Sequence, residues 1–251
     1  MKTIFCADSC PPLEEKSLAA VITSPPYAEQ RAKHYDSVPE SEYPAWTVKW
    51  MDDLRPALSD SGSILVIIRP HIRNGELSDY VLRTRLAVRD AGWVECEELI
   101  WYKPDGPPLG STQRPRRTYE SILWYSKTGR PWADLVACGS HTHRLGFRGS
   151  NRFPEATNKY QRSEAEYSGT TRISDVLVHP INKESWPHPA MCPVSLVDQL
   201  ILTFSRPGDV VCDPFAGSFT TAVSAERLGR GYICWDSNPA YVDIGRKRLD
   251  L

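Results

Sequence analysis

The chain has 251 residues, enough for one α/β domain with an insertion or for two small domains, and enough to bury a full hydrophobic core. Its formal net charge of −1 does not by itself indicate a protein that binds nucleic acid. No apolar run approaches the ~20 residues of a membrane span, and the first eight residues are too short and too soon acidic for a signal peptide. We therefore expect no membrane contact and a cytoplasmic setting.

Strands and helices are predicted to alternate along most of the chain. Strands are expected where apolar and β-branched residues run continuously, and helices where apolar residues recur every third or fourth position. This alternation is typical of an α/β fold. The expected strands are residues 3–7, 20–23, 63–69, 93–102, 118–125, 209–213 and 232–236; the expected helices are 43–58, 78–91, 194–204, 218–228 and 239–248, and residues 13–19 form a connection that could be helical.

Near the N-terminus, a short apolar strand leads into a stiff loop. Ser24, Pro25, Pro26 and Tyr27 directly follow the strand at residues 20–23. Proline fixes φ and lacks a backbone N–H, so the loop leaves the sheet extended, with its carbonyl groups unpaired. Together with the Ser24 hydroxyl and the Tyr27 ring, these carbonyls could hold a planar ring that carries an NH2 group. A strand end followed by a proline-rich turn would explain the same four residues.

A second polar group of residues follows a buried strand near the C-terminus. Residues 213–221 read Asp-Pro-Phe-Ala-Gly-Ser-Phe-Thr-Thr and lead into a helix. Gly217 allows close backbone approach, and the helix N-terminus suits a carboxylate or another anion. Asp236 ends the next strand, where a carboxylate can accept hydrogen bonds from ribose hydroxyls. The sequence has neither Gly-x-Gly-x-x-Gly nor Gly-Lys-Ser/Thr, so a nucleoside with a small charged tail, such as S-adenosylmethionine, fits better than a dinucleotide or a triphosphate.

The chain resembles the permuted (β) group of DNA amino-methyltransferases, in which the catalytic motif precedes the cofactor motif. Residues 23–27 are similar to the catalytic motif and residues 213–218 to the cofactor motif. Residues 188–196, His-Pro-Ala-Met-Cys-Pro-Val-Ser-Leu, and residues 117–123, Arg-Thr-Tyr-Glu-Ser-Ile-Leu, also follow the family pattern. The resemblance implies an α/β, Rossmann-like methyltransferase fold: a circularly permuted, mostly parallel seven-stranded sheet with helices on both faces.

The permutation also implies where the chain ends meet. The strands near Val210 and Tyr232 should lie beside the N-terminal strand, and the loops at residues 24–27 and 214–218 should face each other. Residues 1–137 and 174–251 would form the catalytic and cofactor domain. Residues 138–173 would form an irregular target-recognition insertion.

Positive charge is concentrated in and before this insertion. Residues 113–172 contain eleven Lys and Arg but five Asp and Glu, a net charge of +6, against −7 for the rest of the chain. This asymmetry predicts one face that meets phosphate groups. The seven cysteines are expected to be free thiols, with Cys96, Cys212 and Cys234 buried. Cys138, His141 and His143 could suggest zinc, but no second pair stands at metal-site spacing, and we expect no metal.

The resemblance implies a role for individual residues. The catalytic residues would be Ser24, Pro25, Pro26 and Tyr27. The residues that bind S-adenosylmethionine would be Asp8, Thr23, Ser195, Asp213, Pro214, Phe215, Gly217, Ser218, Thr220, Asp236 and Ser237. The residues that bind DNA would be Arg114, Arg116, Arg117, Arg144, Arg148, Arg152 and Lys159. The chain departs from the family at Ala7 and Asp236, where Gly and Glu are commoner, and at Phe219, which stands in place of a small residue and should tighten the cofactor loop.

The reaction implied is methyl transfer to an exocyclic NH2 group of a flipped-out base in double-stranded DNA. Within the family, Ser before Pro-Pro-Tyr is mostly associated with N4 of cytosine, and Asp with N6 of adenine, so Ser24 favours cytosine. Three alternatives stay open: an adenine-N6 enzyme of the same fold, a related enzyme acting on RNA or a small molecule, and a non-catalytic DNA-binding module. A cognate restriction endonuclease could be a partner, the protein could be a monomer or a dimer, and its source could be bacterial, archaeal or phage.

Overall fold

The computed structural model describes residues 1–29, 38–106, 113–139, 170–181, 186 and 191–251. Strands and helices alternate over most of these residues, as the sequence predicted. The elements in chain order are β1 (Lys2–Cys6), β2 (Leu18–Thr23), α1 (Tyr43–Leu54), β3 (Leu58–Ile68), β4 (Ile72–Arg73), β5 (Glu76–Leu77), α2 (Tyr80–Asp90), β6 (Val94–Tyr102), β7 (Tyr119–Ser126), β8 (Val176–Val178), α3 (Val194–Phe204), β9 (Val210–Asp213), α4 (Thr220–Arg227), β10 (Gly231–Asp236) and α5 (Pro239–Arg248).

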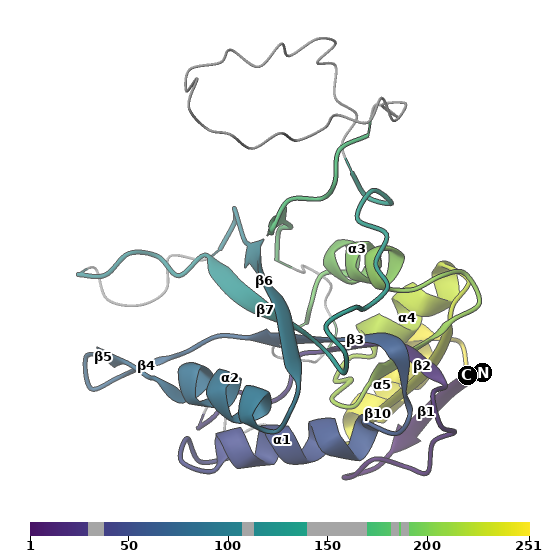
Figure 1. The fold of residues 1–251 in the computed structure, drawn as a ribbon, viewed down its shortest axis with the longest axis horizontal. Coiled ribbons are helices and arrows are strands. Elements are labelled where there is room, and N and C mark those ends of the chain that lie inside the picture. The colour runs from purple at the N-terminus through teal and green to yellow at the C-terminus, as the bar shows by residue number, and fades with distance from the viewer. Residues whose placement is uncertain (30–37, 107–112, 140–169, 182–185, 187–190) are drawn as a thin grey trace.

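An eight-stranded sheet in the order β1-β10-β9-β2-β3-β7-β6-β8 organises these elements (Figure 1). The first five strands in this order, which run from β1 through β10, β9 and β2 to β3, pair in parallel. By contrast, β7 is antiparallel to both β3 and β6. The expected pairing of the C-terminal strands beside the N-terminal one is therefore confirmed. The sheet has one strand more than expected, because Val176–Val178, after the predicted insertion, pairs in parallel with the outer strand β6.

The sheet is covered on both faces. Residues of α1 and α2 pack in one hydrophobic cluster, and residues of α3, α4 and α5 pack in a second cluster on the opposite face (Figure 1). The apolar run of β3 is buried from Ser63 to Ile68, as expected for a strand covered on both sides. Within the described residues, no helix is both long and apolar enough to span a bilayer.

The prediction for the first long helix was wrong at its C-terminal end. We expected a helix over residues 43–58, but α1 ends at Leu54 and β3 begins at Leu58. Pro56 explains the difference, since proline cannot donate the helical hydrogen bond and disfavours helical geometry in the residue before it. Leu58, which continued the helical pattern, is instead buried as the first residue of β3.

Phe219 occupies an unusual backbone position at the start of α4. Its φ is +59°, in the left-handed region, and its side chain is completely buried. The ring packs against Gly245 of α5: a Cβ at position 245 would lie 2.5 Å from the ring atoms. The bulk that was expected to tighten the cofactor loop is thus directed into the core.

Gly245→Ala should therefore destabilise the protein by about 1–3 kcal/mol, because the added methyl group overpacks the core against Phe219. Chemical denaturation measures this change in the free energy of unfolding. In a double-mutant cycle, Phe219→Ala combined with Gly245→Ala should lose less stability than the two single changes together, since the methyl group then has space. Strict additivity would contradict the contact.

Candidate active site

The two motifs singled out in the sequence lie side by side at one edge of the sheet. Strand β2 ends at Thr23, directly before Ser24–Tyr27, and strand β9 ends at Asp213, directly before Pro214. The two strands are parallel neighbours, with Val21 opposite Cys212. Because parallel neighbours present their carboxyl ends at the same edge, the two loops face each other there, as the permutation predicted.

A buried carboxylate joins the two motifs. The Thr23 hydroxyl donates to Asp213 Oδ1 at 2.7 Å, and the Thr221 hydroxyl donates to Oδ2 at 2.8 Å. The backbone N–H of Phe215 also donates to Oδ1, at 3.1 Å. Burial raises the pKa of Asp213 to about 7, although these three hydrogen bonds act to lower it. Asp213 thus holds the end of β2, the loop after β9 and the first turn of α4 in one arrangement.

A second carboxylate holds the loop after β9 against the loop after β10. Asp236 Oδ2 accepts from the Gly217 N–H at 2.8 Å, and Oδ1 accepts from the Asn238 N–H at 2.9 Å. Burial raises the pKa of Asp236. Asp236 remains partly exposed, and each carboxylate oxygen has further lone pairs, so the group can also accept from a ligand hydroxyl. Asp8 is exposed two residues beyond β1, the strand that pairs with β10.

An arginine that sequence reasoning did not single out supports the start of α4. Arg248, in the last turn of α5, donates to the Ser218 carbonyl at 2.7 Å and to Thr220 Oγ1 at 3.0 Å. The side chains of Ser218 and Thr220 are buried and lie 3.2 Å apart. The sequence indicated only that the last turn of this helix is basic. Basic residues are common at helix C-termini because they interact favourably with the helix dipole, so this feature did not point to a role in the site.

Three further predicted cofactor-binding residues, Phe215, Ser237 and Ser195, contact elements around this edge of the sheet. Phe215 packs on Trp46 and Trp50 of α1, with ring centroids 5.2 and 5.5 Å apart. The Ser237 carbonyl accepts from the Cys6 thiol at 3.7 Å, which places it at the ends of β1 and β10. Ser195, at the start of α3, lies 2.9 Å from Nδ1 of His179, which follows β8.

On the other side of the catalytic motif, Tyr27 contacts the antiparallel strands. Its hydroxyl donates to Glu120 Oε2 of β7 at 2.7 Å, and Glu120 Oε1 pairs with Lys103, which directly follows β6. The pKa of Tyr27 is raised well above its usual value, mainly by burial and then by the charge of Glu120, while a hydrogen bond from Ser24 acts to lower it. Glu120 belongs to a motif recognised in the sequence, but nothing there linked it or Lys103 to Tyr27, which is 93 positions from Glu120.

Three of the predicted DNA-binding arginines lie in the described residues, and each contacts a backbone carbonyl. Arg114 donates to Gly75, Arg116 to Gly106 at 3.2 Å, and Arg117 to Pro70. Burial lowers the pKa of Arg117. The other predicted residues, Arg144, Arg148, Arg152 and Lys159, lie outside the described residues, as does most of the predicted insertion.

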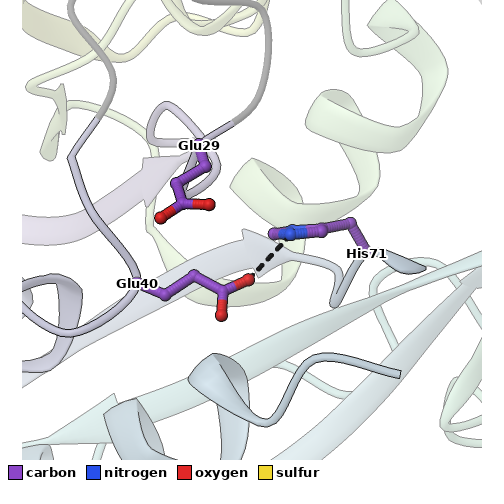
Figure 2. A group of neighbouring side chains, drawn as sticks. All are labelled: Glu29, Glu40 and His71. Atoms are coloured by element: carbon purple, nitrogen blue, oxygen red, sulfur yellow. Dashed lines mark ion pairs between the residues drawn. The ribbon is translucent and has the colours of Figure 1, made fainter. Parts of the chain in front are cut away.

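Within the residues that the structure describes, a cluster of possible metal ligands begins two residues after Tyr27, and Figure 2 shows its side chains. Ligand atoms of Glu29, Glu40 and His71 lie within 4.8 Å of one another. However, His71 Nε2 lies 2.7 Å from Glu40, and Glu29 pairs with Arg73, so both carboxylates already have a basic partner. We interpret the cluster as a contact of Glu40 with His71 and an ion pair of Glu29 with Arg73 of β4.

The cysteines form no disulfide. Cys212 and Cys234 are buried as predicted, but Cys96 is only partly buried, because it lies on β6 near the edge of the sheet. Cys192 lies near Tyr27 and Glu120, and its burial raises the pKa of its thiol to about 12. Of the three residues weighed as zinc ligands, His141 and His143 lie outside the described residues.

The chain is similar in sequence to known proteins. The N6/N4 DNA methylase family model matches residues 18–247. The chain is 25% identical to the type II methyltransferase M.PvuII of Proteus hauseri, over 96% of this chain and 81% of that protein. It is 28% identical to the type II methyltransferase M.HpaI of Haemophilus parainfluenzae, over 95% of this chain and 70% of that protein.

Solved structures share the fold. The PvuII DNA methyltransferase, described as cytosine-N4-specific, superposes with a TM-score of 0.73 at 24% identity, over 94% of this chain and 81% of that one. The M1.HpyAVI–SAM complex superposes with a TM-score of 0.62 at 20% identity, over 95% of this chain and 90% of that one.

Proposed function

Because the chain belongs to the N6/N4 DNA methylase family, we propose that it transfers a methyl group from S-adenosylmethionine to N4 of cytosine in double-stranded DNA. The observation that carries the proposal is the adjacency of two loops: Ser24–Tyr27 and the loop after Asp213 follow neighbouring parallel strands and share the Thr23–Asp213 hydrogen bond. The choice of cytosine rests on Ser24 and on the similarity to a cytosine-N4-specific enzyme.

The chemistry of the residues at this edge fits S-adenosylmethionine. Asp236 offers a partly exposed carboxylate to ribose hydroxyls, and Asp8, beyond the adjacent strand end, offers a second carboxylate to the adenine. Gly217, with a φ of +50°, lets the backbone approach a ligand closely beside the start of α4. When bound, S-adenosylmethionine supplies a methyl group on a sulfonium centre, which needs no metal ion.

The catalytic loop would act by position and by hydrogen bonding. An exocyclic amine is a weak nucleophile because its lone pair is delocalised into the ring. The Ser24 hydroxyl and the Pro25 carbonyl would accept hydrogen bonds from this amine, oppose the delocalisation and orient its lone pair. Tyr27 would stack on the flipped-out base. Pro25 and Pro26 keep the loop rigid.

The DNA contacts and the setting belong to the same proposal. Residues 138–173 would recognise the target sequence, with Arg114, Arg116 and Arg117 as well as Arg144, Arg148, Arg152 and Lys159 on phosphate groups. The protein would act in the cytoplasm, beside a cognate restriction endonuclease if it is part of a type II system like those of its relatives.

Mass spectrometry of methylated DNA tests the function directly. The protein is incubated with mixed-sequence duplex DNA and S-adenosylmethionine, and the DNA is digested to nucleosides. N4-methylcytosine is the expected product. N6-methyladenine would overturn the choice of base but keep the reaction, and DNA without any methylated nucleoside would overturn the proposal.

Arg248→Met tests the support of the cofactor loop. The substitution removes the two hydrogen bonds that the Arg248 side chain donates to Ser218 and Thr220 at the start of α4. We therefore expect the Kd for S-adenosylmethionine to rise about 10-fold, equivalent to ~1.4 kcal/mol. Isothermal titration calorimetry measures the change. Arg246→Met is the matched control, since Arg246 lies in the same helical turn but pairs with the exposed Asp243. An equal effect of both variants would contradict a specific role for Arg248.

A further inference from the structure

A buried ion pair on the antiparallel strands contacts the tyrosine of the catalytic loop. Lys103 and Glu120 have side chains that are only 12% exposed each. One Glu120 oxygen pairs with Lys103 and the other accepts from the Tyr27 hydroxyl at 2.7 Å. Three separate segments therefore meet at Glu120: the loop after β2, the end of β6 and the start of β7.

The surroundings fix both members of the pair. Trp101 of β6 lies opposite Glu120 of β7 in the sheet, and the Lys103 ammonium lies 3.9 Å from the centroid of the Trp101 ring. The Lys103 N–H donates to the Thr118 carbonyl, which continues the pairing of β6 with β7 beyond the strand ends. The pairing of β6 with β7 therefore fixes the position at which Glu120 accepts the hydrogen bond from Tyr27.

Charge explains why both residues are needed. A carboxylate that is largely shielded from water is stabilised by an adjacent cation, and removing that cation destabilises it. Glu120 makes both contacts at once: Oε1 pairs with the Lys103 ammonium and Oε2 accepts from the Tyr27 hydroxyl. The raised pKa of Tyr27 keeps that hydroxyl protonated, and Ser24 lies against the same phenol.

We propose that Glu120 and Lys103 form a positioning pair, which holds the Tyr27 ring in the plane that stacks on the target base. The proposal rests on the proposed methyltransferase function. Pro25 and Pro26 hold the backbone at one end of Tyr27, and Glu120 holds the hydroxyl at the other end of the side chain. With both ends held, the ring is oriented before the base arrives, and no ordering is needed when it binds.

The test uses a variant that removes the pair without leaving a single buried charge. In Glu120→Gln/Lys103→Met, we expect kcat on mixed-sequence duplex DNA to fall about 10- to 100-fold, with the Kd for S-adenosylmethionine within about twofold of wild type. Lys103→Arg, which keeps the cation, should retain more activity than Lys103→Met. The matched control is Glu98→Gln, which breaks the partly buried pair between Arg85 of α2 and Glu98 of β6 and should leave kcat within about twofold.

Fluorine NMR supplies a readout that does not depend on catalysis. The protein is labelled with 3-fluorotyrosine, and the Tyr27 resonance is identified by its absence in Tyr27→Phe. We expect this resonance to shift and narrow in the double variant and to stay in place in Glu98→Gln. A double variant with wild-type kcat and an unchanged Tyr27 resonance would overturn the proposal, as would an equal loss of kcat in Glu98→Gln. Failure of wild type to methylate DNA would overturn the proposed function instead, while the fluorine comparison would still show whether the pair holds Tyr27.

Discussion

Tyr27→Ala is expected to lower the turnover of methyl transfer about 100-fold or more, while S-adenosylmethionine still binds. The substitution removes the ring on which the flipped-out base would stack, and stacking on an aromatic side chain is worth about 1–3 kcal/mol per base. It also removes the hydrogen bond to Glu120, so the base loses its orientation relative to the methyl group. The cofactor residues on the loop after β9 are unchanged, which is why binding should persist.

Methylation kinetics and calorimetry separate these two effects. Single-turnover rates on duplex DNA report the methyl transfer, and titration with S-adenosylmethionine reports cofactor binding. Tyr27→Phe keeps the ring but loses the contact with Glu120, and we expect it to fall between wild type and Tyr27→Ala. Wild-type turnover in Tyr27→Ala would exclude Tyr27 as the stacking residue.

Asp213→Ala is expected to lower the free energy of unfolding by about 3–5 kcal/mol and to abolish cofactor binding. The alanine leaves two buried hydroxyls, of Thr23 and Thr221, and the Phe215 N–H without the carboxylate that accepts from them. Each buried donor without a partner costs about 1–3 kcal/mol. The two motif loops also lose their common anchor.

Urea denaturation measures the stability change, and Asp243→Ala is the control. Asp243 is exposed and pairs with Arg246 on the surface of α5, so its loss should cost less than about 1 kcal/mol. If Asp213→Ala were as stable as this control, the carboxylate would not join the two loops.

The pKa of Asp213 also predicts how stability depends on pH. The pKa of Asp213 in the folded state, about 7, lies above the usual 3.8. Between about pH 4 and pH 7, Asp213 is therefore mostly protonated in the folded protein but mostly ionised in the unfolded chain. The resulting stabilisation is fully present below pH 4 and is lost as the pH rises to 7. At one pKa unit per ~1.4 kcal/mol, the loss amounts to at most about 4 kcal/mol.

Denaturation curves from pH 5 to 8 test whether the free energy of unfolding falls as the pH rises. Stability should fall across the range in wild type, and the fall should be smaller in Asp213→Asn, which cannot titrate. Asp236, whose pKa is also raised, accounts for part of any remaining slope. A steeper fall in Asp213→Asn than in wild type would contradict the assignment to Asp213.

The sequence by itself determined most of the strands and helices and the order of the two motifs, although it did not indicate the short strands β4, β5 and β8. Continuous apolar runs are sufficient to predict strands such as Ile64–Ile68 within β3, because a buried strand needs apolar side chains on both faces. The stretches Ser24–Tyr27 and 213–218 carry distinctive residue types, and the rule that parallel strands share an edge brought their loops together. The expectation failed locally at residues 55–58, where the apolar pattern continued but Pro56 ended the helix.

Only the tertiary structure decided which residues support those motifs. The contacts of Tyr27 with Glu120, of Thr23 with Asp213 and of Ser218 with Arg248 join positions 93, 190 and 30 residues apart. Such pairs leave no periodic signal, because a glutamate or an arginine in a strand or a last helical turn is usually on the solvated surface. Whether it is buried against a loop depends on how the sheet twists and which segments fold over its edge. That arrangement is a property of the whole packed chain rather than of any local stretch.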